Sequence, residues 1–87
     1  MELGLFHMPL HPAERQLGDV IAENSEKIIY ADELGFAEAW VGEHYSATTE
    51  PITSPLIFLA SLLPQTRNIR LGTGVLCLPN HHPAQLA

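Results

Sequence analysis

The residues best suited to chemistry are five histidines and a carboxylate that stands next to one of them. Glu43 and His44 follow an apolar run directly. An imidazole beside a carboxylate can act as a general acid or base near neutral pH, because the histidine proton exchanges in that range. The alternative is a surface Glu43 and a His44 that is hydrogen-bonded to a loop carbonyl, and the spacing alone favours neither reading.

Two other histidines, His81 and His82, are adjacent and precede a proline. Adjacent side chains of an extended chain point in different directions, and no third ligand has metal-site spacing, so we predict no metal site. A helix N-cap role for one of the two, ahead of Pro83, is favoured. His11 lies in a predicted loop and has no evident partner.

The segment Gly72-Thr73-Gly74 invites a dinucleotide-binding interpretation, which fails. The third glycine of that fingerprint would fall on Cys77, and Leu78-Pro79 follows where a helix should begin. Two glycines inside a predicted strand indicate instead a backbone that bends or that lets a ligand approach closely. A strand that bends without any ligand fits equally well.

Three apolar runs, at Leu3–Met8, Ala37–Val41 and Ile69–Leu76, have the character of strands. Their starts are separated by 34 and 32 residues, which accommodates a strand, a helix and two loops. The runs are apolar without clean alternation, as in parallel strands that are covered on both faces. Trp40, inside the second run, is expected to be core or a pocket wall.

The segments between these runs read as helices. The first has one apolar face and ends at Gly35, which is expected to be a left-handed C-cap; the face consists of Leu17, Ile21, Asn24, Ile28 and Ala31. The second begins with an N-cap at Ser54 and Pro55, runs over Leu56–Leu63 and stops at Pro64. Because it is apolar all round, we expect burial on several sides. A third helix begins at His82-Pro83.

The resulting βαβαβ order predicts an α/β protein whose parallel strands are adjacent in chain order. Repeats of this length favour the N-terminal segment of a TIM (β/α) barrel over the competing doubly wound sheet. In both architectures the functional edge is the C-terminal end of the strands, where the loops Pro9–Gln16, Gly42–Thr53 and Leu76–His82 meet. Residues 1–87 are read as three βα units, with the third helix cut short.

Composition excludes several functions. With 4 basic and 10 acidic residues in 87, and a formal charge of -6, the chain lacks the basic face that nucleic acid requires. Its longest apolar stretch is far short of the ~20 residues that cross a bilayer, so no membrane partner is expected. Cys77 is the only cysteine and no signal peptide precedes the first run, so we expect a cytoplasmic protein.

The segments Ala39–Tyr45, Glu50–Pro55 and Ile69–Pro83 resemble the flavin-dependent monooxygenases related to the bacterial luciferases. The start, Gly4–Pro12, looks most like the branch that includes the limonene and diketocamphane monooxygenases. The resemblance spans nearly all 87 residues.

The resemblance implies a TIM barrel that binds reduced FMN at its C-terminal mouth, takes that flavin from a separate reductase, and uses O2 to oxygenate a small apolar organic substrate. It implies that His44 is the acid–base residue, and that Glu43, Thr73, Gly74 and Val75 lie at the flavin, with a peptide between the last two that is often cis. A homo-oligomer is also expected. The phosphate-binding residues of the family fall beyond this chain, so residues 1–87 alone are not expected to turn over.

Two alternatives stay open. One is a deazaflavin-dependent oxidoreductase of the same superfamily, which transfers hydride and uses no oxygen. The other is a chain without flavin chemistry that self-associates through its open sheet edges.

Overall fold

The three predicted strands form one parallel sheet. The structure is a computed structural model that describes residues 1–87. Its elements in chain order are β1 (Gly4–His7), α1 (Leu17–Glu33), β2 (Glu38–Val41), α2 (Pro55–Leu62), the 3-10 turn η1 (Leu63–Gln65), β3 (Arg70–Thr73), the 3-10 turn η2 (Leu78–Asn80) and α3 (Pro83–Leu86). None of these helices is both long enough and apolar enough to cross a membrane.

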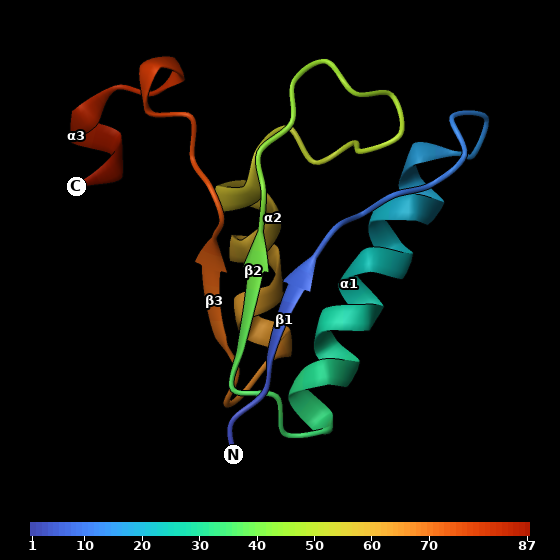
Figure 1. The fold of residues 1–87 in the computed structure, drawn as a ribbon, viewed down its shortest axis with the longest axis vertical. Helices are drawn as coiled ribbons and strands as arrows, with labels where there is room; N and C mark the ends of the chain where they lie inside the picture. The colour runs from blue at the N-terminus through green and yellow to red at the C-terminus, as the bar shows by residue number, and fades with distance from the viewer.

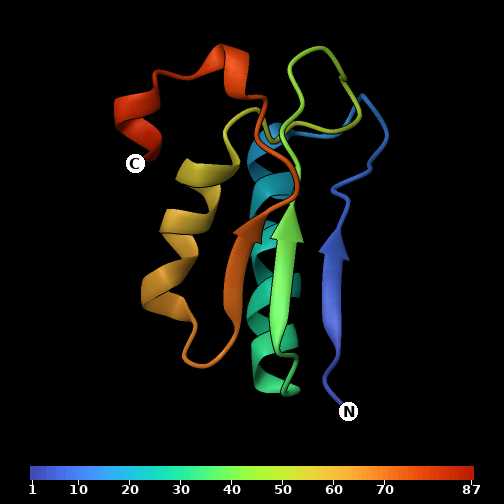
Figure 2. The same ribbon diagram turned by 60° about the vertical axis from the view of Figure 1, so that its left-hand side comes forward.

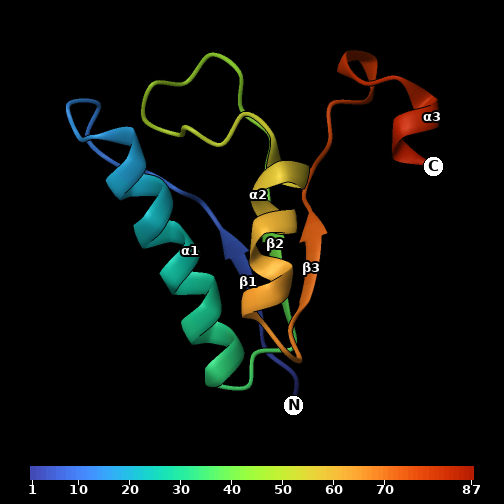
Figure 3. The same ribbon diagram turned by 180° about the vertical axis from the view of Figure 1, so that it is seen from behind.

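The strands lie in the order β1-β2-β3, and both pairs are parallel. This confirms the predicted strand order and excludes an arrangement with β1 in the centre. Both long helices lie on the same side of the sheet. The sheet is in front of the helices in Figure 1, and the helices are in front of the sheet in Figure 3. The expected α/β organisation with a parallel sheet is therefore present.

The two faces of the sheet differ sharply. Ala39 and Val41 of β2 are fully buried against the helices. They belong to a core of nine apolar residues: Ile28, Ala31, Ala39, Val41, Ile52, Phe58, Leu59, Leu62 and Ile69. Phe6, Trp40 and Gly72 share one register position on the opposite face, where Trp40 is 41% exposed. The expectation of strands covered on both faces is wrong for this chain, because both helices pack on one side. Trp40 therefore lies outside the core, which leaves the pocket-wall interpretation of this residue.

Helix α1 ends as its sequence predicts. Gly35 has a φ of 88°, the left-handed conformation that glycine adopts without steric cost. The buried positions are Val20, Asn24, Ile28 and Ala31. Leu17 was expected on this face but is exposed, because it is the first helical residue and lies beyond the part of α1 that packs on the sheet.

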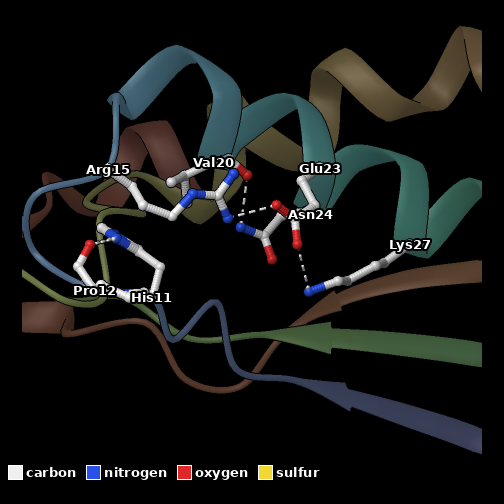
Figure 4. A network of polar contacts seen from close by, with 7 residues as sticks. All are labelled: His11, Pro12, Arg15, Val20, Glu23, Asn24 and Lys27. Carbon is white, nitrogen blue, oxygen red and sulfur yellow. Dashed lines mark hydrogen bonds and ion pairs between the residues drawn. The ribbon is translucent and has the colours of Figure 1, made fainter.

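Polar contacts join the β1–α1 loop to the first turns of α1 (Figure 4). Arg15 Nη1 donates a hydrogen bond of 2.6 Å to Glu23 Oε2, and Lys27 Nζ lies 3.5 Å from the other oxygen of that carboxylate. The hydrogen bond from Arg15, together with its charge, lowers the pKa of the Glu23 carboxyl. These exposed contacts fix the path by which the chain leaves β1.

Helix α2 begins with Pro55 at its first position, as predicted, although the side chain of Ser54 makes no capping hydrogen bond. Only one side of α2 is buried, and Ile57 on the other side is 74% exposed. The expected burial on several sides is wrong here, because α2 packs with a single face on the sheet.

A carboxylate at the opposite, N-terminal edge of the sheet holds the start of β3. Asp32 at the end of α1 accepts hydrogen bonds from the backbone N–H groups of Arg67, Asn68 and Ile69, at 2.8, 3.0 and 2.8 Å. These backbone bonds lower the pKa of Asp32. Asp32 thereby connects α1 to the segment that leads into β3.

Candidate active site

The segments that follow the three strands gather at one end of the sheet (Figure 2). They surround a hollow of about 150 Å³ at the C-terminal ends of β1 and β2. Its lining residues are Phe6, His7, Met8, Gly42, Glu43, His44, Gly74 and Val75. The structure therefore brings together four of the five predicted site residues, from two segments more than 30 positions apart.

Thr73, the fifth predicted site residue, does not line this hollow. It borders a separate groove beside α2, together with Leu56, Leu59 and Leu63. The reason is the alternation of side chains along a strand: Thr73 is in register with Val41, which faces the helices.

Glycines leave the backbone open where the strands end. A Cβ on Gly42 would lie 3.1 Å from Nε2 of His44 and 3.2 Å from the carbonyl oxygen of Gly74. A Cβ on Gly74 would lie 3.4 Å from the ring of Phe6. The space beside the Gly74 backbone is therefore bordered by a polar imidazole and an aromatic ring, and no side chain of its own fills it.

Gly72 has a different role from the one expected of a glycine in this strand. A Cβ at Gly72 would lie 2.8 Å from the indole ring of Trp40, closer than real Cβ contacts allow. Glycine is therefore needed there for the packing of Trp40, and no ligand is required to explain it.

Strand β3 ends at Thr73, earlier than the predicted Leu76. Gly74 still donates a backbone hydrogen bond of 2.8 Å to the carbonyl of Val41. The peptide bond between Gly74 and Val75 is cis, which confirms the link that the resemblance implied. Val75 itself is exposed beside the hollow.

The carboxylate of Glu43 is completely buried and fully partnered. Its Oε2 accepts a hydrogen bond of 2.8 Å from the backbone N–H of Cys77, and its Oε1 lies 2.7 Å from Nε2 of His81. The hydroxyl of Tyr45 donates to the same Oε1. Glu43 therefore joins the end of β2 to the segment that follows β3, and both of its oxygens are used within the protein.

His44 has a much looser environment than its neighbour. Its Nδ1 lies 3.4 Å from Oε2 of Glu50, and its side chain is 34% exposed. Glu50 comes from the long loop between β2 and α2, which closes because the N–H of His44 donates to the carbonyl of Ile52 at 3.1 Å. An exposed imidazole beside a carboxylate, at the rim of a hollow, has the geometry that proton transfer to a bound molecule requires.

His7 is buried at the end of β1 and also lines the hollow. Burial lowers the pKa of His7, the charge of Lys27 lowers it further, and the side chain of Asn24 opposes the shift. Nε2 of His7 and Oδ1 of Asn24 are both buried, and neither makes a hydrogen bond of normal geometry. His7 is therefore held neutral around pH 7 in the wall of the hollow.

The sequence predicts an N-cap at one of the two adjacent histidines, and the structure shows that this residue is His82. Two other contacts were missed. Nδ1 of His82 accepts a hydrogen bond from the N–H of Ala84, which confirms an N-cap ahead of Pro83. The contacts of His81 with Glu43 and of Glu50 with His44 were not predicted. One signal for the second was available, since Glu50 is the only carboxylate between His44 and Ser54.

The fold and the hollow define a class: a parallel α/β protein with a histidine beside a carboxylate at the C-terminal ends of its strands. The family model described as luciferase-like monooxygenase matches residues 1–87. The chain belongs to this family of monooxygenases.

Individual relatives agree with this assignment. The chain is 44% identical over 87 residues to the 4-hydroxyprotoasukamycin monooxygenase of Streptomyces nodosus subsp. asukaensis, and 40% identical to the limonene 1,2-monooxygenase of Rhodococcus erythropolis. These matches cover 100% of this chain but 24% and 22% of the two relatives. The chain thus spans about a quarter of the length of the curated relatives that it matches.

Among solved structures, one similar protein is the oxygenating constituent of the 3,6-diketocamphane monooxygenase of Pseudomonas putida, described as a type II Baeyer–Villiger monooxygenase in complex with FMN. The TM-score is 0.91 at 30% identity, over 99% of this chain and 24% of that one. The backbone described above therefore closely matches one segment of that FMN-binding protein.

Proposed function

We propose that this chain is part of an FMN-dependent monooxygenase that oxygenates a small apolar organic molecule. The observation that carries the proposal is the hollow at the strand ends, where His44, a third of whose side chain is exposed, faces bare glycine backbone and apolar side chains. Membership of the monooxygenase family supports the reaction class. The printed description of the Pseudomonas putida relative, which binds FMN, supports the cofactor.

The residues present fit a flat, largely apolar ring system. The backbone of Gly74 is uncovered, and Phe6 and the exposed Val75 border the same hollow. Such surfaces suit an aromatic ring, which gains contact area without leaving buried polar groups unpaired. When bound, reduced FMN would supply the two electrons with which one oxygen atom of O2 enters the substrate and the other leaves as water.

Each residue then has a definite task. Gly74 and Val75 would form the surface against which the ring rests, and Phe6 would keep water from its edge. His44 would accept or donate a proton at Nε2, the ring nitrogen that borders the space over Gly42. Glu43 would hold the Gly74–Cys77 segment in place through its hydrogen bond to the N–H of Cys77.

The hollow supplies one wall of a binding site. Pockets for small ligands usually enclose about 300–1,000 Å³, and this hollow has about 150 Å³. We propose that further strands of a TIM barrel complete it. Support comes from the bare sheet face with Phe6 and Trp40, and from relatives about four times as long.

A separate reductase, acting in the cytoplasm, would deliver the reduced flavin. The related Pseudomonas putida protein is described as the oxygenating constituent of its system, which implies a second component there. Cys77 is free, as suits a reducing compartment.

The test is made on a complete barrel that carries these residues. FMN is reduced anaerobically, its binding is titrated by absorbance, and oxygen uptake and product are then followed with limonene and with a bicyclic ketone as probe substrates. We expect binding of reduced FMN and oxygen-dependent product. Turnover of a deazaflavin without oxygen uptake would overturn the proposal in favour of the hydride-transferring alternative.

A second candidate function has one specific observation in its favour. Apolar side chains are exposed on both sides of the molecule, among them Phe6, Trp40, Ile57 and Leu63. Patches of this kind promote self-association. A stable oligomer of residues 1–87 that ignores FMN in the same titration would favour a non-catalytic role.

A further inference from the structure

Glu50 occupies an unusual position for a loop carboxylate. In the loop from Gly42 to Ser54, the backbone N–H of His44 donates a hydrogen bond to the carbonyl of Ile52. The loop therefore folds back on itself, and Glu50 lies beside His44. The side chain of Glu50 is only 14% exposed, and its Oε2 lies 3.4 Å from Nδ1 of the imidazole. The nearest charged partner of this carboxylate is therefore His44.

The pair is not arranged for stability. Oε1 of Glu50 is buried and has no hydrogen-bond partner. A buried acceptor without a partner is destabilising, and more so when it is charged. A carboxylate that is retained under such conditions needs another explanation, and its contact with His44 supplies one.

The contact decides which imidazole nitrogen carries the proton. An ionised carboxylate can only accept hydrogen bonds, so a neutral His44 that donates to Glu50 does so from a protonated Nδ1. Nε2 then keeps its lone pair, and this is the nitrogen that borders the hollow beside the Gly74 carbonyl.

We propose that Glu50 is a positioning residue for His44: it holds the imidazole as the Nδ1–H tautomer, so that Nε2 faces the hollow as a proton acceptor. The inference rests on the proposed function for its catalytic meaning, and it adds a residue to which no role was assigned. The distance of 3.4 Å is long, as contacts of this kind often are before a ligand is bound.

The first test needs no flavin. The 87-residue chain is labelled with ¹⁵N, and long-range ¹H–¹⁵N spectra of its histidines are recorded at about pH 8.5, two units above the ordinary histidine pKa. His82 is an internal reference, because its Nδ1 accepts a hydrogen bond and its proton must sit on Nε2. We expect the opposite tautomer for His44.

Two variants separate positioning from a general structural effect. Glu50→Ala removes the acceptor, and His44 should then change to the Nε2–H form that free histidine prefers. Glu50→Gln keeps an amide oxygen that can accept from Nδ1, and should retain more of the Nδ1–H form. The proposal is overturned if His44 of the unsubstituted chain shows the Nε2–H or the free-histidine pattern. It is also overturned if Glu50→Ala leaves the Nδ1–H form unchanged.

The second test uses the complete flavin-loaded enzyme. Loss of the partner that orients a histidine in a metal site lowers affinity or activity by about 10–100-fold. By analogy, Glu50→Ala should lower product formation by about that factor while the affinity for FMN stays unchanged. Glu50→Gln should be affected less. Equal product from all three proteins would overturn the positioning role. An enzyme that shows the tautomer but binds no FMN would instead overturn the proposed function and leave the assignment of Glu50 standing.

Discussion

Two carboxylate–histidine pairs lie at the same edge of the sheet, and they are built in opposite ways. The Glu43 carboxylate is completely buried and the His81 side chain is 17% exposed. The two lie 2.7 Å apart and share their network with Tyr45 and the N–H of Cys77. Glu50 and His44 lie 3.4 Å apart, His44 is a third exposed, and one carboxylate oxygen has no partner. Although Glu43 and His44 are adjacent in sequence, they belong to different pairs.

This difference in burial and hydrogen bonding separates a pair that stabilises the fold from a pair that is accessible to a ligand. Both oxygens of the buried Glu43 carboxylate are engaged within the protein, and breaking such a pair leaves uncompensated polar groups. A pair with an exposed imidazole and an unsatisfied oxygen contributes little to stability but keeps one nitrogen available. The Glu43 pair therefore fixes two segments together, and the Glu50 pair leaves an accessible imidazole at the hollow.

The largest expected effect comes from the open pair. General acid–base groups contribute about 10²–10⁴ in rate, so His44→Ala in the complete flavin-loaded enzyme should lower product formation by that factor. Reduced FMN should still bind and be oxidised, with hydrogen peroxide released in place of product. The measurement is product by gas chromatography beside peroxide by a coupled assay.

His82→Ala is the matched control for this change. It removes an exposed imidazole from the same edge of the sheet, outside the hollow. Full product from His82→Ala and from His44→Ala alike would show that His44 is an ordinary loop histidine.

The next effect concerns the closed pair and is one of stability. Glu43→Ala leaves His81 Nε2, the Tyr45 hydroxyl and the Cys77 N–H without their acceptor. Removing one partner of a buried pair costs about 3–5 kcal/mol, and we expect this loss in the free energy of unfolding measured with urea. Glu43→Gln keeps the shape and one acceptor, so it should cost less and is measured if the alanine variant does not fold.

Glu50→Ala serves as the comparison for Glu43→Ala. Because Glu50 has an unpartnered buried oxygen, its removal should change the free energy of unfolding far less. Equal losses from both substitutions would erase the distinction between a structural and a functional pair.

The residues of these two pairs also show which features could be predicted from the sequence and which could not. Local signals were sufficient for the left-handed Gly35, Pro55 at the start of α2 and an N-cap ahead of Pro83, because each depends on neighbours within a few residues. The strand order was predicted from the spacing of the βα repeats and the topology that they favour. His44, Glu43, Gly74 and Val75 came together because parallel strands end at one edge. Their place in a site follows from that topology.

The remaining features depend on contacts between distant segments. Glu43 and His81 are 38 positions apart, and their contact requires the precise path of the segment after β3. The sheet face on which Trp40 lies follows from alternation along β2. Whether that face is covered depends on which side both helices pack, and the apolar pattern of the strands could not decide it.

A third carboxylate, Asp32, has backbone donors and no histidine partner. Its substitution measures how much stability such donors alone provide. Asp32 accepts three backbone hydrogen bonds at the opposite edge of the sheet. Asp32→Ala should lower the melting temperature, by less than Glu43→Ala, because Asp32 is exposed to solvent. Since its folded pKa is lowered, its contribution is present above the unfolded pKa of about 4 and is lost as the pH falls through the folded value. The melting temperature of Asp32→Ala should therefore approach that of the unsubstituted chain below that pH.

The smallest effect concerns a histidine that has no carboxylate. His7 lines the same hollow, but burial lowers its pKa and its nearest polar neighbour is Asn24. The unfolded chain therefore takes up a proton at a higher pH than the folded chain does. Stability is unaffected by this group well above the unfolded pKa of about 6.5. It declines as the pH falls below that value, until the lowered folded pKa is reached.

His7→Gln keeps a polar side chain beside Asn24 and removes the titration, so the melting temperature should fall less between pH 7 and pH 5 than in the unsubstituted chain. An identical decline in both proteins would mean that His7 is protonated in the folded state as easily as in the unfolded one. His7, which has no carboxylate partner, would then not differ in its protonation from a histidine in the unfolded chain.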